Sequence, residues 1–121
     1  VVHSVAVAEL GGRSHAVTAG HDGSVRVWDL ATGDQTRELT GHTDVVHSVA
    51  VAELGGRSHA VTAGHDGSVR VWDLATGACL TTYHFPAVTR AVTVTADGTV
   101  VLGVGQDVVA LSLAPLARRL L

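Results

Sequence analysis

Histidine is the residue type in this sequence with the widest chemical range, because imidazole binds metals, transfers protons and changes charge near neutral pH. Six of the eight histidines fall into two sets of three: His3, His15 and His21, then His47, His59 and His65; the others are His42 and His84. Zinc sites use clustered His and Cys ligands. No i, i+2 pair and no Cys-x-x-Cys gathers these residues, so we expect no metal and no cofactor.

A serine nucleophile is the second chemistry to consider. Ser4 or Ser24 could combine with His15 and Asp22, provided that the groups come within hydrogen-bond reach in a site that excludes water. No Gly-x-Ser-x-Gly elbow marks such a site. Asp22 precedes Gly23, a pair typical of a hairpin turn. We therefore expect no enzymatic activity.

The overall composition predicts one modest folded domain. The chain has 121 residues, 46% of them hydrophobic and 16% charged, with a net charge of −3. Its apolar runs are too short to span a bilayer and no signal peptide opens it, which predicts a cytoplasmic protein with no membrane partner. The arginines are scattered and lysine is absent, so nucleic acid is not expected as a partner. The absence of Lys, Ile, Asn and Met favours a high-GC bacterial gene.

The element that must position these residues is a tandem repeat. Residues 1–33 recur unchanged as residues 45–77. A repeat of this length needs neighbours of the same shape to bury its apolar surface.

Within the repeat, period-two alternation predicts four antiparallel strands. Val5 and Val7 share one face of the first strand, and Ser4, Ala6 and Ala8 share the other. The predicted strands are residues 1–10, 15–20, 24–30 and 35–39, joined by Gly11–Gly12, Asp22–Gly23 and the turn at residues 31–34. Small residues beside the valines suit a sheet covered on both faces.

The last part of the chain is predicted to be a third, diverged copy. Its strands are expected at residues 88–94, 100–105 and 107–113, followed by a turn at residues 114–116 and an outer strand at residues 117–121. The units are about 1–43, 44–86 and 87–121.

The period, Gly41–His42 before a strand, Asp66–Gly67 in a turn and Trp72–Asp73 closing a strand together resemble the tryptophan–aspartate (WD-repeat) β-propeller family, in a bacterial type with near-identical blades. The resemblance implies an all-β propeller fold with four-stranded blades. It also implies a buried hydrogen-bond network of His42, Thr62, Asp66 and Trp72 in the second blade.

The other two blades are expected to depart from this network. The first has Thr18, Asp22 and Trp28 without an upstream Gly-His pair. The third has His84 and Asp107, but Gly103 and Leu111 stand where Thr and Trp belong. We predict one complete network, one lacking its histidine and one abandoned.

Three blades are too few to close a ring, since propellers of this class close with four to eight blades. Head-to-tail contacts would complete six blades from a dimer or nine from a trimer. A piece of a longer propeller is the other explanation.

By resemblance, partners contact the face around the central channel: His3, His21, Val45, His47 and His65, with Val1, Arg90 and Gln106 at related positions. We therefore predict a scaffold for a protein or peptide ligand. The alternative is a designed or recently amplified repeat protein with no ligand of its own.

Overall fold

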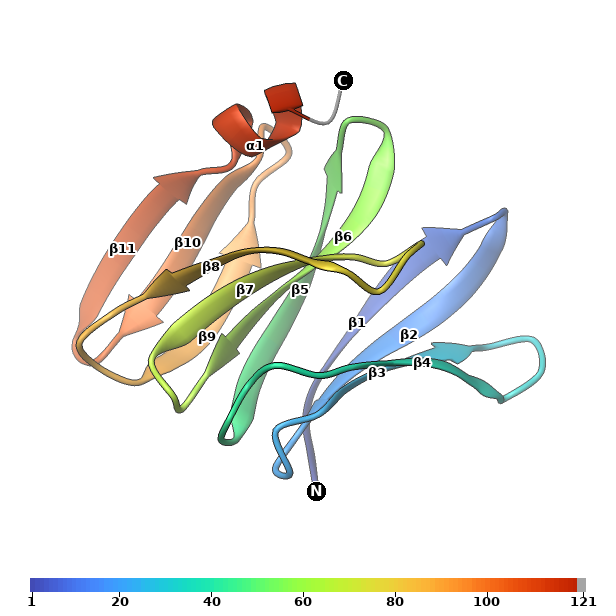
Figure 1. Ribbon diagram of the computed structural model, residues 1–121, viewed down its shortest axis with the longest axis horizontal. Helices are drawn as coiled ribbons and strands as arrows, with labels where there is room; N and C mark the ends of the chain where they lie inside the picture. Colours follow the sequence, from blue (N-terminus) through green and yellow to red (C-terminus); the bar gives the residue numbers. More distant parts are fainter. Residues whose placement is uncertain (120–121) are drawn as a thin grey trace.

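The computed structural model describes residues 1–119, and within them the chain forms three antiparallel sheets and one short helix (Figure 1). The first sheet contains β1 (Val2–Leu10), β2 (Arg13–Gly20), β3 (Val25–Asp29) and β4 (Gln35–Leu39). The second contains β5 (Val46–Leu54), β6 (Arg57–Gly64), β7 (Ser68–Asp73) and β8 (Cys79–His84). The third contains β9 (Thr89–Val94), β10 (Thr99–Val104) and β11 (Asp107–Ser112).

Each sheet is a meander in which strands that are consecutive in the chain pair with one another. The tight turns lie where the sequence predicts them. Gly11 and Gly12 have φ angles of 60° and 77°, and Gly23 has 83°, a region that glycine enters without steric cost. The all-β fold of antiparallel blades predicted from the sequence is confirmed.

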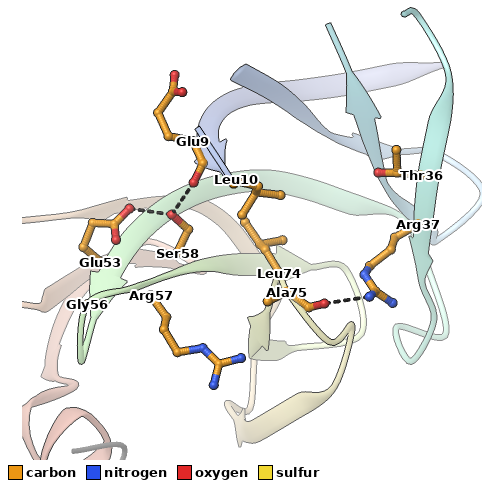
Figure 2. A pocket seen from close by; sticks show the side chains of 11 residues that line it. Glu9, Leu10, Thr36, Arg37, Glu53, Gly56, Arg57, Ser58, Leu74 and Ala75 are labelled. Carbon is orange, nitrogen blue, oxygen red and sulfur yellow. Dashed lines mark hydrogen bonds between the residues drawn. The ribbon is translucent and has the colours of Figure 1, made fainter. Parts of the chain in front are cut away.

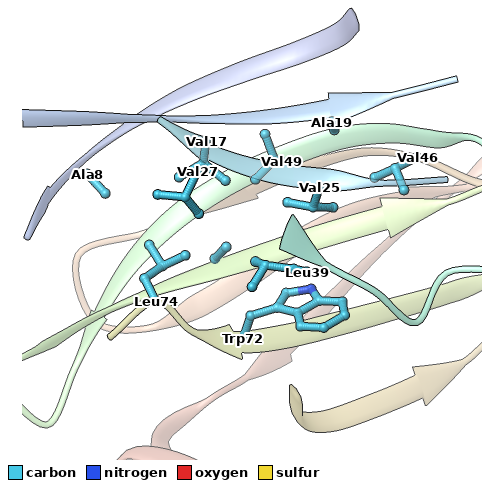
Figure 3. Close-up of a cluster of buried hydrophobic side chains, with 11 residues drawn as sticks. Ala8, Val17, Ala19, Val25, Val27, Leu39, Val46, Val49, Trp72 and Leu74 are labelled. Carbon is cyan, nitrogen blue, oxygen red and sulfur yellow. The ribbon is translucent and has the colours of Figure 1, made fainter. Parts of the chain in front are cut away.

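The three sheets stack side by side with their first strands as neighbours, so β5 lies between β1 and β9. Successive side chains along each strand point to opposite faces of the sheet, so the second sheet contributes side chains to two hydrophobic cores. Trp72 and Leu74 pack against Val25, Val27 and Leu39 of the first sheet (Figure 3). The other face of the second sheet carries Val61, Ala63, Val69 and Val71 into a core shared with β10. Within residues 1–119, only the middle sheet is covered on both faces.

The predicted fourth strand of the third sheet, at residues 117–121, is wrong. Residues Ala114–Arg119 form the helix α1, which also replaces the turn expected at residues 114–116; residues 120–121 lie outside the described part. Ala, Leu and Arg favour helix, and Pro115 suits a first turn. The Ala114 N–H donates to Ser112 Oγ at 3.1 Å. Leu113 and Leu116 are buried in the second core.

The array is open at both ends, as an incomplete propeller is. Among residues 1–119, no helix is both long and apolar enough to cross a membrane.

Candidate functional site

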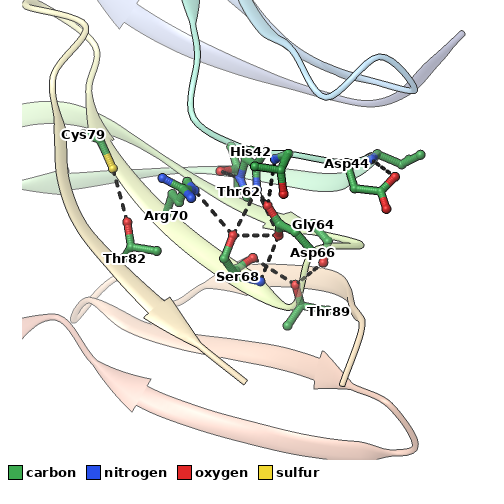
Figure 4. Close-up of polar contacts among 12 residues, drawn as sticks. His42, Asp44, Thr62, Gly64, Asp66, Ser68, Arg70, Cys79, Thr82 and Thr89 are labelled. Atoms are coloured by element: carbon green, nitrogen blue, oxygen red, sulfur yellow. Dashed lines mark hydrogen bonds and ion pairs between the residues drawn. The ribbon is translucent and has the colours of Figure 1, made fainter. Parts of the chain in front are cut away.

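The second sheet holds His42 in a buried polar network (Figure 4). Thr62 lies on β6, Trp72 on β7 and Asp66 in the turn between them, while His42 belongs to the linker that precedes β5. Thr62 Oγ1 lies 2.6 Å from His42 Nε2 and accepts the Trp72 indole N–H at 2.9 Å. His42 Nδ1 lies 3.1 Å from Asp66 Oδ2. The structure thus brings together all four residues that the resemblance implied.

The partners determine the state of each group. A carboxylate only accepts, so the proton of His42 sits on Nδ1, and Nε2 accepts from the Thr62 hydroxyl. Burial lowers the pKa of His42, and the nearby Asp66 carboxylate only partly opposes this. Burial would raise the pKa of Asp66, but hydrogen bonds from Ser68 and from the Thr43 N–H lower it to about 2. The native pair is therefore a neutral imidazole beside a carboxylate.

This charge state predicts how stability depends on pH. Because the pKa of His42 is lower in the folded chain, the unfolded chain binds more protons below about pH 6.5, and stability falls as the pH falls. The loss is at most about 1.4 kcal/mol per pH unit for this histidine. Urea unfolding between pH 8 and 5 should show a steeper loss in the natural chain than in His42→Asn. Parallel profiles would contradict the assignment. Asp66 does not interfere, because its contribution is lost only between about pH 3.8 and 2.

The first sheet carries the same residues without an imidazole among them. Trp28 Nε1 donates to Thr18 Oγ1 at 3.1 Å, as in the second sheet. Asp22 Oδ2 instead accepts from Arg26 Nη2 at 3.1 Å. Hydrogen bonds from the Ser24 side chain and backbone, with further help from Arg26, lower the pKa of Asp22 to about 2. This sheet therefore retains the acceptors of the network.

In the third sheet, strand register corrects two residue equivalences made from the sequence. Leu102 pairs with Val109 as Thr62 pairs with Arg70, so Leu102, not Gly103, occupies the threonine position. A Cβ on Gly23 would lie near the carbonyl oxygens of His42 and Asp44, two residues apart in the linker. A Cβ on Gly67 would lie near those of Phe85 and Ala87, so Phe85, not His84, takes the position of His42. The Leu102 equivalence shifts because the β9–β10 hairpin is shorter than the β5–β6 hairpin. These positions are apolar.

Four of the predicted partner-face residues form one row across the first two sheets. His3 Nε2 lies 3.3 Å from His21 Nδ1, and His47 Nε2 lies 3.1 Å from His65 Nδ1. The His3 and His47 rings are 6.0 Å apart. Val45 contributes its carbonyl oxygen to the His65 N–H at 2.7 Å. Burial, Arg90 and the neighbouring imidazoles lower the pKa of His47, although Asp44 opposes them.

The serine, histidine and aspartate residues considered as a nucleophilic site do not come together in the structure. Ser24 Oγ donates to Asp22, but His15 Nδ1 bonds to the Arg13 carbonyl oxygen at the other end of β2. Ser4 Oγ accepts the Val49 N–H across the sheet interface. Across the described residues, no group of three or more His, Cys, Asp or Glu side chains is placed to hold a metal ion.

Sequence reasoning missed a cavity of about 550 Å³ between the first two sheets (Figure 2). Ser58 Oγ donates there to Glu53 and lies 3.1 Å from the Glu9 carbonyl oxygen. Arg37 Nη2 donates to the Ala75 carbonyl oxygen at 2.6 Å. The Ser58–Glu9 and Arg37–Ala75 contacts join different repeats, so no spacing within one repeat could signal them. The network serine, Ser68, was also missed, although a serine two residues after a turn aspartate is a recognisable signal.

The sequence profile of WD40, described as WD domain, G-beta repeat, matches residues 2–29 and 33–73, more than half of the chain. A solved structure, "Crystal structure of WD40 beta propeller domain of Doa1", is similar with a TM-score of 0.72 and 25% sequence identity. The match covers 88% of this chain and 35% of that chain, so the chain spans about a third of that propeller's length. No curated protein matches.

Proposed function

Because the chain belongs to the WD40 repeat family, we propose that it is a non-enzymatic scaffold for protein–protein interaction whose copies complete a ring head to tail. One observation carries this proposal. The outer face of the first sheet repeats, residue for residue, the face by which the second sheet packs on the first.

The same residues are exposed in one copy and covered in the other. Val5 is 59% exposed, whereas its equivalent Val49 is 6% exposed. Leu30 is 54% exposed, whereas its equivalent Leu74 is 1% exposed. Val7 adds a third exposed apolar side chain to the same face. An apolar surface of this kind is typical of an association site.

The opposite end of the array offers the complementary surface. On the third sheet, Val108 is 80% exposed and lies beside an apolar cavity of about 300 Å³ lined by Ala91, Val101 and Gly103, among others. By strand register, Val101 and Val108 correspond to Val61 and Val69, which the second sheet buries against the third. Placing this surface on the first sheet of another copy gives a heterologous contact that closes by rotation, as a dimer of six blades or a trimer of nine.

The histidine row is the surface we assign to a protein or peptide ligand. His3, His21, His47 and His65 stand side by side at one end of the innermost strands, where an assembled ring would line its central channel. Ligand binding at this face is expected to depend on pH through His47, whose pKa burial, Arg90 and the neighbouring imidazoles hold below its ordinary value.

A piece of a longer propeller is the alternative, and the 35% coverage of the solved propeller chain favours it. In that case neighbouring blades of the same polypeptide cover both open faces. A designed or recently amplified repeat with no ligand of its own is consistent with the unchanged copies. For a natural chain, we propose a bacterial origin, with near-identical blades, and a cytoplasmic location.

Placing a charge on the open face of the first sheet tests whether copies of the chain associate through it. We expect Val7→Asp to convert the assembled species into a monomer, because burying a carboxylate without a partner costs several kcal/mol. The measurement is mass by sedimentation velocity over a range of concentrations. Cys79→Asp, at an exposed position on β8, is the matched control and should leave the mass unchanged. A natural chain that stays monomeric at high concentration would overturn head-to-tail assembly.

A further inference from the structure

The four imidazoles of the histidine row stand as two pairs whose ring nitrogens face one another. His3 Nε2 lies 3.3 Å from His21 Nδ1, and His47 Nε2 lies 3.1 Å from His65 Nδ1. The members of each pair are 18 residues apart, and they meet because the beginning of β1 or β5 lies beside the end of β2 or β6 in its hairpin. Pairing of strands, rather than spacing along the chain, therefore brings two metal-binding side chains together in each hairpin.

We propose that each pair binds one divalent transition-metal ion such as Zn²⁺, with one ring nitrogen of each histidine as a ligand. The coordinating atoms are His3 Nε2 and His21 Nδ1 in the first sheet, and His47 Nε2 and His65 Nδ1 in the second. Both ligands of each site belong to one chain, so the two metal sites require neither the assembly nor the peptide ligand proposed above.

The separation of the ring nitrogens matches the distance between two ligands of one metal ion. Zinc binds an imidazole nitrogen at about 2.0–2.1 Å, so two such nitrogens lie about 2.9 Å apart at a right angle and about 3.4 Å apart at the tetrahedral angle. The separations of 3.1 and 3.3 Å fall within this range. Within residues 1–119, no group of three or more His, Cys, Asp or Glu side chains is placed to hold an ion. Each site therefore has two protein ligands, and water completes the coordination.

The metal ion replaces the proton that links each pair. In the metal-free pair one nitrogen donates its N–H to the other, so coordination requires this proton to move to the outer nitrogen of the same ring. Each imidazole must also turn until its lone pair points at the ion, and this rotation about χ2 is easy because χ2 of histidine is broadly distributed. His3, His21 and His65 are exposed and His47 is half-buried, so the rings have room to turn and the ion can reach them.

The charges around the second pair affect both its protonation and its affinity for a cation. Burial, Arg90 and the neighbouring imidazoles lower the pKa of His47, whereas Asp44 opposes them. The neutral ring keeps its lone pair for the metal at neutral pH, but the Arg90 guanidinium also repels a cation. We therefore expect Arg90→Gln to strengthen zinc binding at His47 and His65. Acid should weaken binding, because protons compete with the ion for the ring nitrogens.

The third sheet has other residues at the positions of the pair. Arg90 is the second residue of β9, as His47 is of β5. Gly105, not Gln106, takes the position of His65, because the backbone N–H of each donates to the carbonyl oxygen of the residue just before the first strand of its sheet. Arginine and glycine side chains supply no metal ligand, so we expect two ions per chain and none at the third sheet.

The test is calorimetric titration of Zn²⁺ into the chain at neutral pH. Every chain carries Cys79→Ser, which removes an exposed thiol as a competing zinc ligand. We expect two ions per chain, and one in His21→Asn or His65→Asn, because an imidazole without its partner binds zinc about tenfold or more weakly. His84→Asn, which removes an exposed histidine outside the row, is the matched control and should keep both ions. The Val7→Asp chain should also bind two, which separates zinc binding from assembly.

Nitrogen NMR spectra of the imidazole rings give a second readout. Zinc should shift the signals of His47 Nε2 and His65 Nδ1, and unshifted signals at these atoms would overturn the proposal. Fewer than two ions per chain at submillimolar zinc would also overturn it, as would two ions in the double variant His21→Asn/His65→Asn. A chain that binds zinc but no peptide would overturn the proposed peptide ligand alone, and the reverse result would overturn the metal sites alone.

Discussion

Replacing Trp72 by alanine is expected to lower the free energy of unfolding by about 3–5 kcal/mol, whereas Trp28→Ala costs about 1–2 kcal/mol. Both residues lie in an identical stretch of 33 residues and donate to an identical threonine. Only their surroundings differ. Trp72 is 1% exposed beneath the first sheet, while Trp28 lies on the open face and is half-buried.

The measurement is urea unfolding of both variants at a concentration where the natural chain is monomeric. Trp72→Phe is an informative companion, because it keeps most of the packing and removes only the N–H bond to Thr62, for about 1 kcal/mol. Equal losses for Trp28→Ala and Trp72→Ala in dilute monomer would contradict the burial described for the second sheet. In an assembled ring the two losses should converge, because a neighbouring copy would then cover Trp28.

The second large effect is expected at His42. His42→Ala should cost about 2–4 kcal/mol, because it leaves a cavity and deprives Thr62 and Asp66 of their buried partner. His84→Ala, at an exposed position at the end of β8, should stay within about 0.5 kcal/mol of the natural chain.

Free imidazole adds a readout that general destabilisation would not produce. Imidazole that enters the cavity left by His42→Ala should raise the unfolding temperature of this variant and follow a binding isotherm. The Trp72→Ala variant, destabilised to a similar extent, should show no such rescue. An equal rise in unfolding temperature in the two variants would contradict a specific binding site for imidazole.

Much of this architecture could be predicted because valine alternation and glycine turns are local signals. The strand expected at residues 35–39 coincides with β4, and the predicted Gly11–Gly12 turn is present, with both glycines at positive φ. The end of the chain could not be predicted by analogy with the earlier copies. Helix propensity in Ala114–Arg119 and burial of Leu116 override the strand that the repeat pattern favours.

The candidate site could likewise be predicted only in part. The His42 network could be located because its four residue types carry a family resemblance at fixed spacing. The replacement of threonine by Leu102 required strand register, since a shortened turn displaces every residue after it by an amount that spacing alone does not give. The Arg26–Asp22 pair depends on which side chain reaches the carboxylate, and both copies have the same sequence there.

Two identical stretches in one polypeptide give the refolding chain two equivalent partners for its strands. β1 and β5 share one sequence, so β1 can pair with β6 in the register that β5 uses. The native hairpin closes over Gly55–Gly56, while the exchanged pair must close a loop more than twenty times longer, which costs about 3 kcal/mol in chain entropy. Kinetic partitioning therefore sends on the order of one chain in a hundred into the exchanged pairing. The loop penalty does not apply between molecules, so concentrated refolding should yield strand-swapped dimers.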